Sequence, residues 1–384
     1  MKLRKDKWEE VKFGEIAKAS NLSCNPVEDN IERFVAGDHM ITDELKIKNW
    51  GIVKDVLIGP AFHRKFLPNQ ILYGSRRTYL RKVAISDFEG VCANTTFVID
   101  VKENKTTIPF LAAVMQSGRF TEFSIDNSKG STNPFINWKD IAKYEISLPP
   151  LSEQKQIASL FQSIETAMEQ VDEQEKNLKA LQKTLINGLL SKETAFGNLL
   201  NSKNCMLTTF GEIAVCDKKY PEHNNEVTRF IGLENIESEN FQLQGWGEIA
   251  NGTTFSKRFA KGDVLFGKRR AYLKKVAVAD FDGICSGDIL VIRAKAKKMM
   301  QGLLPYYISS EAFIQHAVST SAGSLSPRTK WKDLSELEVS VPDLKVQEKI
   351  LEVLQQINNT VDQLKQQKTT LKNLKQKLLS EILG

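Results

Sequence analysis

The chain repeats itself, and this internal duplication constrains its fold more than any other feature of the sequence. Phe13-Gly-Glu-Ile-Ala17 recurs as Phe210-Gly-Glu-Ile-Ala214. Residues 72–92 and 265–285 are identical at 13 of 21 positions, at an offset of 193 that persists to the C-terminus. A period of about half of the 384 residues predicts two copies of one structural unit.

Each copy has a mixed part followed by a helical part. Short β-branched runs at 83–85 and 276–278 predict strands, and the stretches 109–123 and 304–318 predict amphipathic helices. We therefore expect an α+β chain. Its expected parts are a first mixed domain (1–150), a first long helix (151–200), a second mixed domain (201–342) and a second long helix (343–384).

The long helices carry apolar residues at alternating steps of four and three, which makes a seam for another helix. The seam residues are Ile157, Phe161, Ile164, Met168, Val171, Leu178 and Leu185 in the first helix, and Ile350, Leu354, Ile357, Val361, Leu364, Leu371 and Leu378 in the second. Polar residues interrupt both seams at matched places, as at Gln182 and Lys375. We expect an antiparallel intramolecular coiled coil with pseudo-twofold symmetry. Two independent surface helices, or a coil between separate molecules, are the alternatives.

A basic motif precedes a predicted strand in each copy, at residues 74–82 and 267–275. Its candidate DNA-binding residues are Arg76, Arg77, Tyr79, Arg81 and Lys82 in the first copy, and Lys268, Arg269, Arg270, Tyr272, Lys274 and Lys275 in the second. Guanidinium groups bind phosphates or guanine edges, and the net charge of +6 favours a polyanionic partner. On an extended segment Arg77, Tyr79 and Arg81 would share one face. The alternative is a solvated strand edge protected by charge.

A second repeated loop, at residues 128–138 and 321–331, keeps its Gly, Ser, Pro and Trp while other positions change. The changes include Lys129 to Ala322, Asn133 to Ser326 and Phe135 to Arg328. A loop that keeps its structural residues while its other side chains change is typical of a DNA-binding domain that contacts different bases in each copy. Ordinary sequence divergence of a loop would give the same pattern. Lys129, Asn133 and Arg328 join the candidate DNA-binding residues.

The sequence offers no convincing catalytic or metal-binding motif. The five cysteines and four histidines are scattered without a CxxC pair, which argues against zinc and for reduced thiols. Asn133-Pro-Phe135 is only part of the Asn-Pro-Pro-aromatic motif of adenine methyltransferases, and residues 245–250 fit a loose GxGxxA without a preceding strand. We expect no catalytic centre, metal or cofactor in this chain. The charged first residues, with no apolar stretch after them, predict a cytoplasmic protein without a membrane span.

Residues 138–158 resemble the junction between target-recognition domain and spacer helix in the specificity subunits of Type I restriction–modification systems. This segment reads Trp138-Lys-Asp-Ile-Ala-Lys-Tyr-Glu-Ile-Ser-Leu-Pro-Pro-Leu-Ser-Glu-Gln-Lys-Gln-Ile-Ala158. The second copy keeps Trp331-Lys-Asp333 and Pro342 but has Asp343 in place of the second proline. Residues 230–236 and 267–288 are also similar to family sequence, so the resemblance covers essentially the whole chain.

The resemblance implies a DNA-recognition subunit without catalysis of its own. Two target-recognition domains, held apart by the coiled coil, would each read half of a split site in double-stranded DNA. Two modification subunits would dock on the coil and bring S-adenosylmethionine chemistry to adenine N6, and restriction subunits would add ATP- and Mg²⁺-dependent translocation and cleavage. The alternatives are a solitary or phage-borne specificity subunit that redirects a host complex, a fused methyltransferase or nuclease with diverged motifs, and a coiled-coil protein without DNA function.

Overall fold

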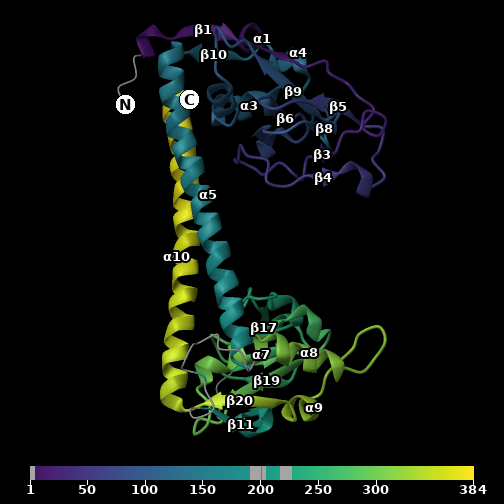
Figure 1. The fold of residues 1–384 in the computed structure, drawn as a ribbon, viewed down its shortest axis with the longest axis vertical. Helices are drawn as coiled ribbons and strands as arrows, with labels where there is room; N and C mark the ends of the chain where they lie inside the picture. The colour runs from purple at the N-terminus through teal and green to yellow at the C-terminus, as the bar shows by residue number, and fades with distance from the viewer. Residues whose placement is uncertain (1–4, 191–199, 201–204, 217–226) are drawn as a thin grey trace. The chain divides into compact units, whose positions relative to one another are not determined.

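The computed structural model describes residues 5–190, 200, 205–216 and 227–384. The predicted start of the second mixed domain, residues 201–204, lies outside these described residues. The chain forms two compact units: unit 1 is Met1–Gln174 with Leu364–Gly384, and unit 2 is Glu175–Gln363. Each unit therefore includes part of both long helices (Figure 1).

Within the described residues, unit 1 contains two four-stranded sheets, with strand orders β2-β9-β6-β7 and β4-β3-β8-β5, and the pair β1-β10. Its strands are β1 (Glu9–Lys12), β2 (Ala17–Ala19), β3 (Arg33–Val35), β4 (Gly51–Ile52), β5 (Phe62–Phe66), β6 (Ile71–Gly74), β7 (Val83–Ile85), β8 (Gly90–Ala93), β9 (Thr96–Val101) and β10 (Glu145–Leu148). Its short helices are α1 (Phe13–Ile16), α2 (Ile108–Met115), α3 (Gly118–Asp126) and α4 (Trp138–Ile141). The strands β3 and β8 are parallel, and the other pairs are antiparallel.

Unit 2 repeats this topology element for element, with sheets β12-β19-β16-β17 and β14-β13-β18-β15 and the pair β11-β20. Its strands are β11 (Cys205–Thr209), β12 (Ala214–Cys216), β13 (Arg229–Ile231), β14 (Gly247–Glu248), β15 (Lys257–Phe259), β16 (Val264–Gly267), β17 (Val276–Val278), β18 (Gly283–Cys285), β19 (Ile289–Ala294) and β20 (Glu338–Pro342). Its short helices are α6 (Phe210–Ile213), α7 (Leu304–Ser309), α8 (Glu311–Ser319) and α9 (Trp331–Ser335). The parallel pair recurs as β13-β18. The sequence repeat is thus a repeat of the fold.

The long helices α5 (Leu151–Gly188) and α10 (Leu344–Leu383) run antiparallel. In unit 1 the first turns of α5 share a core with the last turns of α10, as Phe161 and Leu379 illustrate. In unit 2 the end of α5 shares a core with the start of α10. The antiparallel intramolecular pair predicted from the sequence is confirmed. Among the described helices, none is long and apolar enough to cross a membrane.

Most residues of the predicted seams are buried. These are Ile157, Phe161, Ile164, Met168, Val171, Leu185, Ile350, Leu354, Ile357, Val361 and Leu364. Leu178, Leu371 and Leu378 are half-buried. Near the end of α10, Lys375 is buried at its place in the seam, and Leu379 is buried next to the half-buried Leu378.

Each stretch predicted as one amphipathic helix is two helices. The break lies at Ser117 in unit 1 and at Ser310 in unit 2, where the backbone is extended (ψ 155° and 148°). Each serine Oγ accepts a hydrogen bond from the N–H three residues later, at Phe120 and Phe313. Serine is a favoured N-cap, and here it starts a new helix within a continuous apolar pattern. The prediction of single helices was wrong for this reason.

Candidate nucleic-acid interface

The basic motif of each unit forms a tight turn. In unit 1 a single turn of 3-10 helix, η3 (Thr78–Leu80), lies between Arg77 and Arg81, whose φ angles of 50° and 45° are left-handed. The extended segment with Arg77, Tyr79 and Arg81 on one face was therefore a wrong expectation. The backbone N–H groups of Leu80 and Arg81 donate to the carbonyls of Arg77 and Thr78, which closes the turn.

Unit 2 has the same turn around η7 (Ala271–Leu273), with Arg270 and Lys274 at φ 53° and 50°. A left-handed conformation costs a residue other than glycine about 1–2 kcal/mol. Glycine would avoid that cost, yet both copies place cations at both positions. Because the strained backbone occurs at these basic residues in both units, we infer that their side chains are needed at these positions.

Several cations of the two motifs are held by partners inside their own unit. Arg81 donates from Nε and Nη2 to the two carboxylate oxygens of Asp43, at 2.8 and 2.6 Å. Lys274 donates to Glu311 at 2.7 Å. The ammonium groups of Lys82 and Lys275 donate to backbone carbonyls. These contacts shape the turn and leave less of each charge for a ligand.

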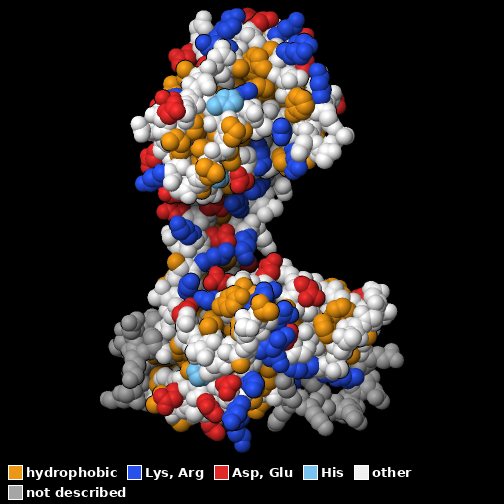
Figure 2. Space-filling view, turned by 90° about the vertical axis from the view of Figure 1, so that its right-hand side faces the viewer, with side chains coloured by type: hydrophobic (Ala, Val, Ile, Leu, Met, Phe, Trp, Pro, Cys, Tyr) orange, Lys and Arg blue, Asp and Glu red, His pale blue; other side chains and the backbone are white. Residues whose placement is uncertain are grey.

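Other side chains of the motif face solvent. Tyr79 is 51% exposed and Tyr272 is 52% exposed, and the side chains of Arg76, Arg77 and Arg270 are exposed as well. Figure 2 shows Lys and Arg side chains lying beside hydrophobic ones over the visible face of each globular part. A cation next to an exposed aromatic ring suits contact with both phosphates and bases.

The structure joins the basic turn to the second repeated loop. In unit 1 the Arg77 N–H donates to the carbonyl of Pro134 at 2.7 Å, and Arg77 Nε donates to Asn133 Oδ1 at 2.7 Å. In unit 2 the Arg270 N–H donates to the carbonyl of Pro327 at 2.8 Å. We call these paired segments the turn–loop surface: residues 74–82 with 128–138 in unit 1, and 267–275 with 321–331 in unit 2.

Two loop residues named from the sequence lie next to carboxylates. Lys129 Nζ is 3.9 Å from Asp140 and its side chain is 58% exposed, so it remains open to a ligand. Arg328 forms a two-pronged ion pair with Asp288. Hydrogen bonds from Arg328 keep the pKa of Asp288 below its ordinary value, although partial burial acts in the opposite direction.

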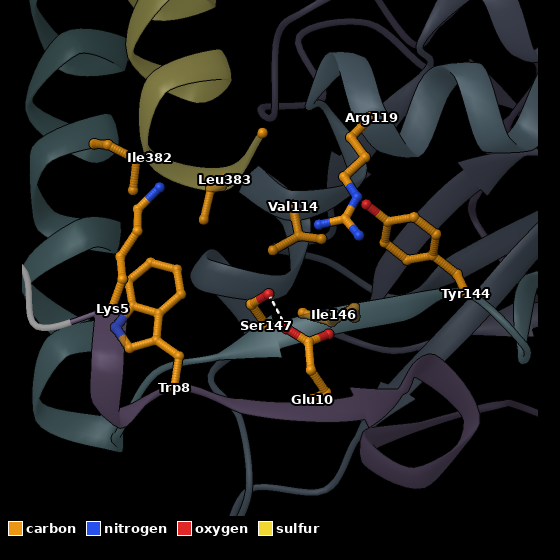
Figure 3. Close-up of a pocket in the computed structure, with 11 residues that line it drawn as sticks. Lys5, Trp8, Glu10, Val114, Arg119, Tyr144, Ile146, Ser147, Ile382 and Leu383 are labelled. Atoms are coloured by element: carbon orange, nitrogen blue, oxygen red, sulfur yellow. Dashed lines mark hydrogen bonds between the residues drawn. The ribbon is translucent and has the colours of Figure 1, made fainter.

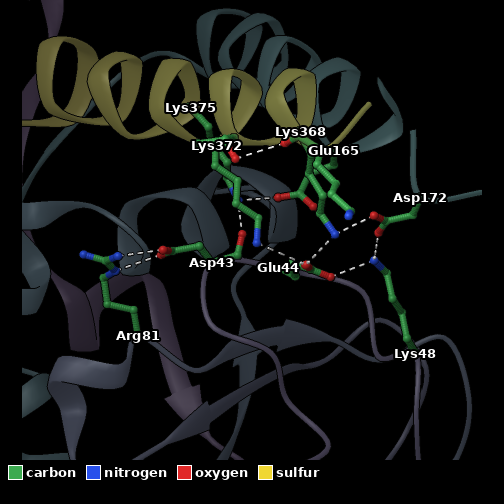
Figure 4. Close-up of polar contacts among 11 residues, drawn as sticks. Asp43, Glu44, Lys48, Arg81, Glu165, Asp172, Lys368, Lys372 and Lys375 are labelled. Atoms are coloured by element: carbon green, nitrogen blue, oxygen red, sulfur yellow. Dashed lines mark hydrogen bonds and ion pairs between the residues drawn. The ribbon is translucent and has the colours of Figure 1, made fainter. Parts of the chain in front are cut away.

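A polar network in unit 1 was missed by sequence reasoning (Figure 4). Lys375 of α10 is 1% exposed; its ammonium donates to the backbone carbonyl of Asp43 at 2.6 Å and pairs with Glu165 of α5. Because the Asp43 carboxylate binds Arg81, the network links the basic turn to both long helices. The sequence analysis treated Lys375 only as an interruption of the seam.

The same network continues through a buried glutamate. Glu44 is 4% exposed and lies 2.7 Å from Lys48, and Lys48 in turn lies 3.0 Å from Asp172. Lys368 pairs with Asp172 at 2.5 Å. Burial raises the pKa of Asp172, but hydrogen bonds from Lys368 and Lys48 outweigh it and keep that pKa below its ordinary value. The segment that carries Asp43 is thus fastened to α5 and α10.

Unit 2 uses amides at the matching positions of the helices. Gln182, the repeat partner of Lys375, donates to Asn358, the repeat partner of Glu165. Asn358 Nδ2 also lies 2.6 Å from Tyr306 Oη. At matching positions of the two long helices, unit 1 therefore has an ion pair and unit 2 has a pair of hydrogen-bonded amides.

Unit 1 also contains a cavity of about 160 Å³ (Figure 3). Its lining includes Trp8 of the N-terminal segment, Arg119 of α3 and Ile382 of α10. None of its lining residues belongs to the turn–loop surface. Within the described residues, no group of three or more His, Cys, Asp or Glu side chains is arranged to hold a metal ion.

Comparison with known proteins places the chain in a family. The model for the Type I restriction modification DNA specificity domain matches residues 5–180 and again residues 201–373. Because these two matches cover most of the sequence, the chain belongs to this family.

The sequence identity to individual relatives is low. The chain is 27% identical over 295 residues to the Type I restriction enzyme EcoDI specificity subunit of Escherichia coli, covering 67% of this chain and 65% of that protein. It is 22% identical to the MjaVIII specificity subunit of Methanocaldococcus jannaschii, covering 68% of this chain and 66% of that one. The chain thus matches slightly less than two thirds of the length of either relative.

Solved structures share the fold over nearly the full length. One chain, from a study of complex assembly and conformational transition of the type I R-M system, has a TM-score of 0.60 at 16% identity, with 97% of this chain and 96% of that chain covered. The Type-I restriction-modification system S subunit from M. genitalium has a TM-score of 0.57 at 14% identity, with 100% and 98% covered.

Proposed function

We propose that this chain is the DNA-recognition subunit of a Type I restriction–modification complex, with no catalytic centre of its own. The observation that carries the proposal is the repeated turn–loop surface. In each unit, basic residues with a left-handed backbone lie next to a loop whose tip has different side chains in the two units. The family membership and the specificity subunits among its relatives support the same function.

In this function each unit reads one half of a bipartite site in double-stranded DNA. The cations kept in both copies, Arg76 and Arg77 in unit 1 and Arg269 and Arg270 in unit 2, hold phosphates and set the orientation of the duplex. The loop tips face base edges, and because they differ, the two half-sites differ too. The four sequential parts predicted from the sequence, 1–150, 151–200, 201–342 and 343–384, serve as recognition domain, spacer, recognition domain and spacer.

Chemistry on the DNA belongs to partner subunits. Two modification subunits, docked on α5 and α10, bring S-adenosylmethionine for transfer of a methyl group to adenine N6. Restriction subunits bring ATP and Mg²⁺. The chain determines the DNA sequence at which these partner subunits act.

Exchanging residues 1–150 for the matching part of another specificity subunit should change one half of the methylated target only. Each unit carries its own turn–loop surface, so the half read by unit 2 should stay as it was. The measurement is a genome-wide map of methylated adenines in cells that carry the variant and its modification subunits. Exchange of residues 201–342 is the matched control and should alter the other half. Maps in which one exchange alters both halves would contradict modular recognition.

Arg76→Ala and Arg81→Ala should have opposite consequences. Arg76 is exposed, so its loss should leave stability within about 0.5 kcal/mol while the log–log salt slope of DNA binding becomes shallower by about 0.9 per lost phosphate contact. Arg81 is bound to Asp43, so its loss should cost about 1.5–3 kcal/mol of stability and leave the salt slope unchanged. Urea unfolding and fluorescence anisotropy at several salt concentrations measure both quantities. A shallower slope with full stability in Arg81→Ala would instead place Arg81 on the DNA.

A further inference from the structure

The two turn–loop surfaces share the same backbone bridges, and several of their side chains differ, including Phe135 in unit 1 and Arg328 in unit 2. Phe135 in unit 1 forms β-bridges with Arg76 and Lys129, and Arg328 in unit 2 forms the equivalent bridges with Arg269 and Ala322. Beside them, Thr95 in unit 1 corresponds to Asp288 in unit 2, and each accepts a hydrogen bond through its backbone carbonyl from the first residue after β6 or β16. A shared frame therefore presents an aromatic ring in one unit and an arginine–aspartate pair in the other.

The guanidinium of Arg328 is held along one edge. Its Nε donates to Asp288 Oδ1 at 2.7 Å, and its Nη2 donates to Asp288 Oδ2 at 3.2 Å. The Arg328 side chain is nevertheless 48% exposed. Among the described residues, the remaining edge, formed by Nη1 and Nη2, has one long contact, from Nη1 to the carbonyl of Ser326 at 3.5 Å. Two parallel donors are thus left directed away from the carboxylate.

The carboxylate is fitted to keep the arginine in this orientation. Asp288 is 21% exposed, and a second guanidinium, that of Arg269, lies 3.7 Å from it. The backbone N–H of Asp288 donates to Ser286 Oγ at 3.2 Å. An arginine ordered before it binds loses less side-chain freedom when it meets a ligand, so the pair is preorganised.

Two parallel N–H donors match one base edge in the major groove. Guanine presents two adjacent acceptors, O6 and N7, whereas adenine presents the N7 acceptor next to the N6 donor. A phosphate also accepts two parallel hydrogen bonds, but that contact carries no base preference. Phe135 can offer only apolar contact, for example with a thymine methyl group.

We propose that Arg328, oriented by Asp288, reads a guanine in the half-site bound by unit 2, and that unit 1 lacks this reading because Phe135 and Thr95 occupy the matching positions. The inference rests on the proposed function and names one base contact within it. Arg328 is in this sense a specificity residue, and Asp288 is its positioning residue.

The test is selection of binding sites from duplexes with randomised bases, using the full chain with its modification subunits. Arg328→Ala should remove the preference for guanine at one position of one half-site, and should weaken binding to the original site about tenfold to a hundredfold. All other positions should keep their preference. Arg328→Lys keeps the positive charge but not the two-pronged edge, and should also lose most of the preference for guanine. Asp288→Asn should keep guanine as the selected base with a weaker preference.

The matched gain-of-function variant is made in unit 1. Phe135→Arg combined with Thr95→Asp should introduce guanine at the corresponding position of the other half-site, and Phe135→Arg alone should do so more weakly. Thermal unfolding of each variant checks that the fold is kept.

Two results separate this inference from the proposed function. If Arg328→Ala keeps every base preference and only makes the salt slope shallower, Arg328 binds a phosphate and the inference is wrong. If the unmodified chain selects no two-part sequence at all, the proposed function itself fails.

Discussion

Lys375→Ala should lower the free energy of unfolding of unit 1 by about 3–5 kcal/mol, because it removes one partner of a buried ion pair. Lys375 is 1% exposed, and without its ammonium group Glu165 keeps a carboxylate in the interior with no cation at that place. The Asp43 carbonyl also loses its donor. Urea unfolding of the full chain, followed by hydrogen exchange of peptides around residues 39–48, measures the loss in unit 1 separately.

Unit 2 provides the model for a control variant. Lys375→Gln with Glu165→Asn copies the amide pair that unit 2 uses at Gln182 and Asn358. This double variant should recover much of the stability lost in Lys375→Ala, since both buried groups are again hydrogen-bonded. If Lys375→Ala costs less than about 1 kcal/mol, the pair behaves as an exposed ion pair does, and the expectation is wrong.

Replacing Arg77 and Arg270 together by glycine should weaken binding to the original DNA site by about a hundredfold or more, since each arginine would lose a charge-assisted contact to a phosphate, worth about 1.5–3 kcal/mol. Stability should stay within about 1 kcal/mol, because glycine adopts the left-handed φ of 50° and 53° without the strain that arginine bears there. Fluorescence anisotropy with the selected duplex gives the affinity, and thermal unfolding gives the stability.

The matched variant replaces the same two arginines by alanine. Alanine keeps the left-handed strain, so this variant should bind DNA as weakly as the glycine variant but be less stable than it by about 1–2 kcal/mol at each of the two positions. Unchanged affinity in both variants would remove these arginines from the DNA interface and leave the turn with a structural role only.

The architecture was predictable because duplication leaves a signal along the whole sequence. Two strands, Val83–Ile85 and Val276–Val278, were located from their β-branched residues alone, and the seam spacing predicted the helix pair. The ends of the helices were harder to predict, because a helix begins at Ser117 and at Ser310 although the apolar pattern continues through both residues. Periodicity reports which face is buried, and it does not report where a serine side chain captures a backbone N–H.

The site was predictable in composition but not in geometry. Nothing in an arginine indicates a left-handed φ, so the turn around Thr78–Leu80 was taken as extended. The ion pairs of Arg81 with Asp43 and of Lys274 with Glu311 could not be read from the sequence, because the partners lie 38 and 37 residues away. Lys375 and Asp43 are 332 residues apart, and only the folded chain brings them together. The assignment of individual residues to bases or phosphates stays a prediction.

The division of the chain also sets an order of events during synthesis. Unit 2 is one continuous stretch, whereas unit 1 closes its core with Leu379 and Ile382, which the ribosome adds after every residue of unit 2. Domains usually fold in the order in which they leave the ribosome. Here the half that is made first waits for the final turns of α10, so the N-terminal half is the last to be completed.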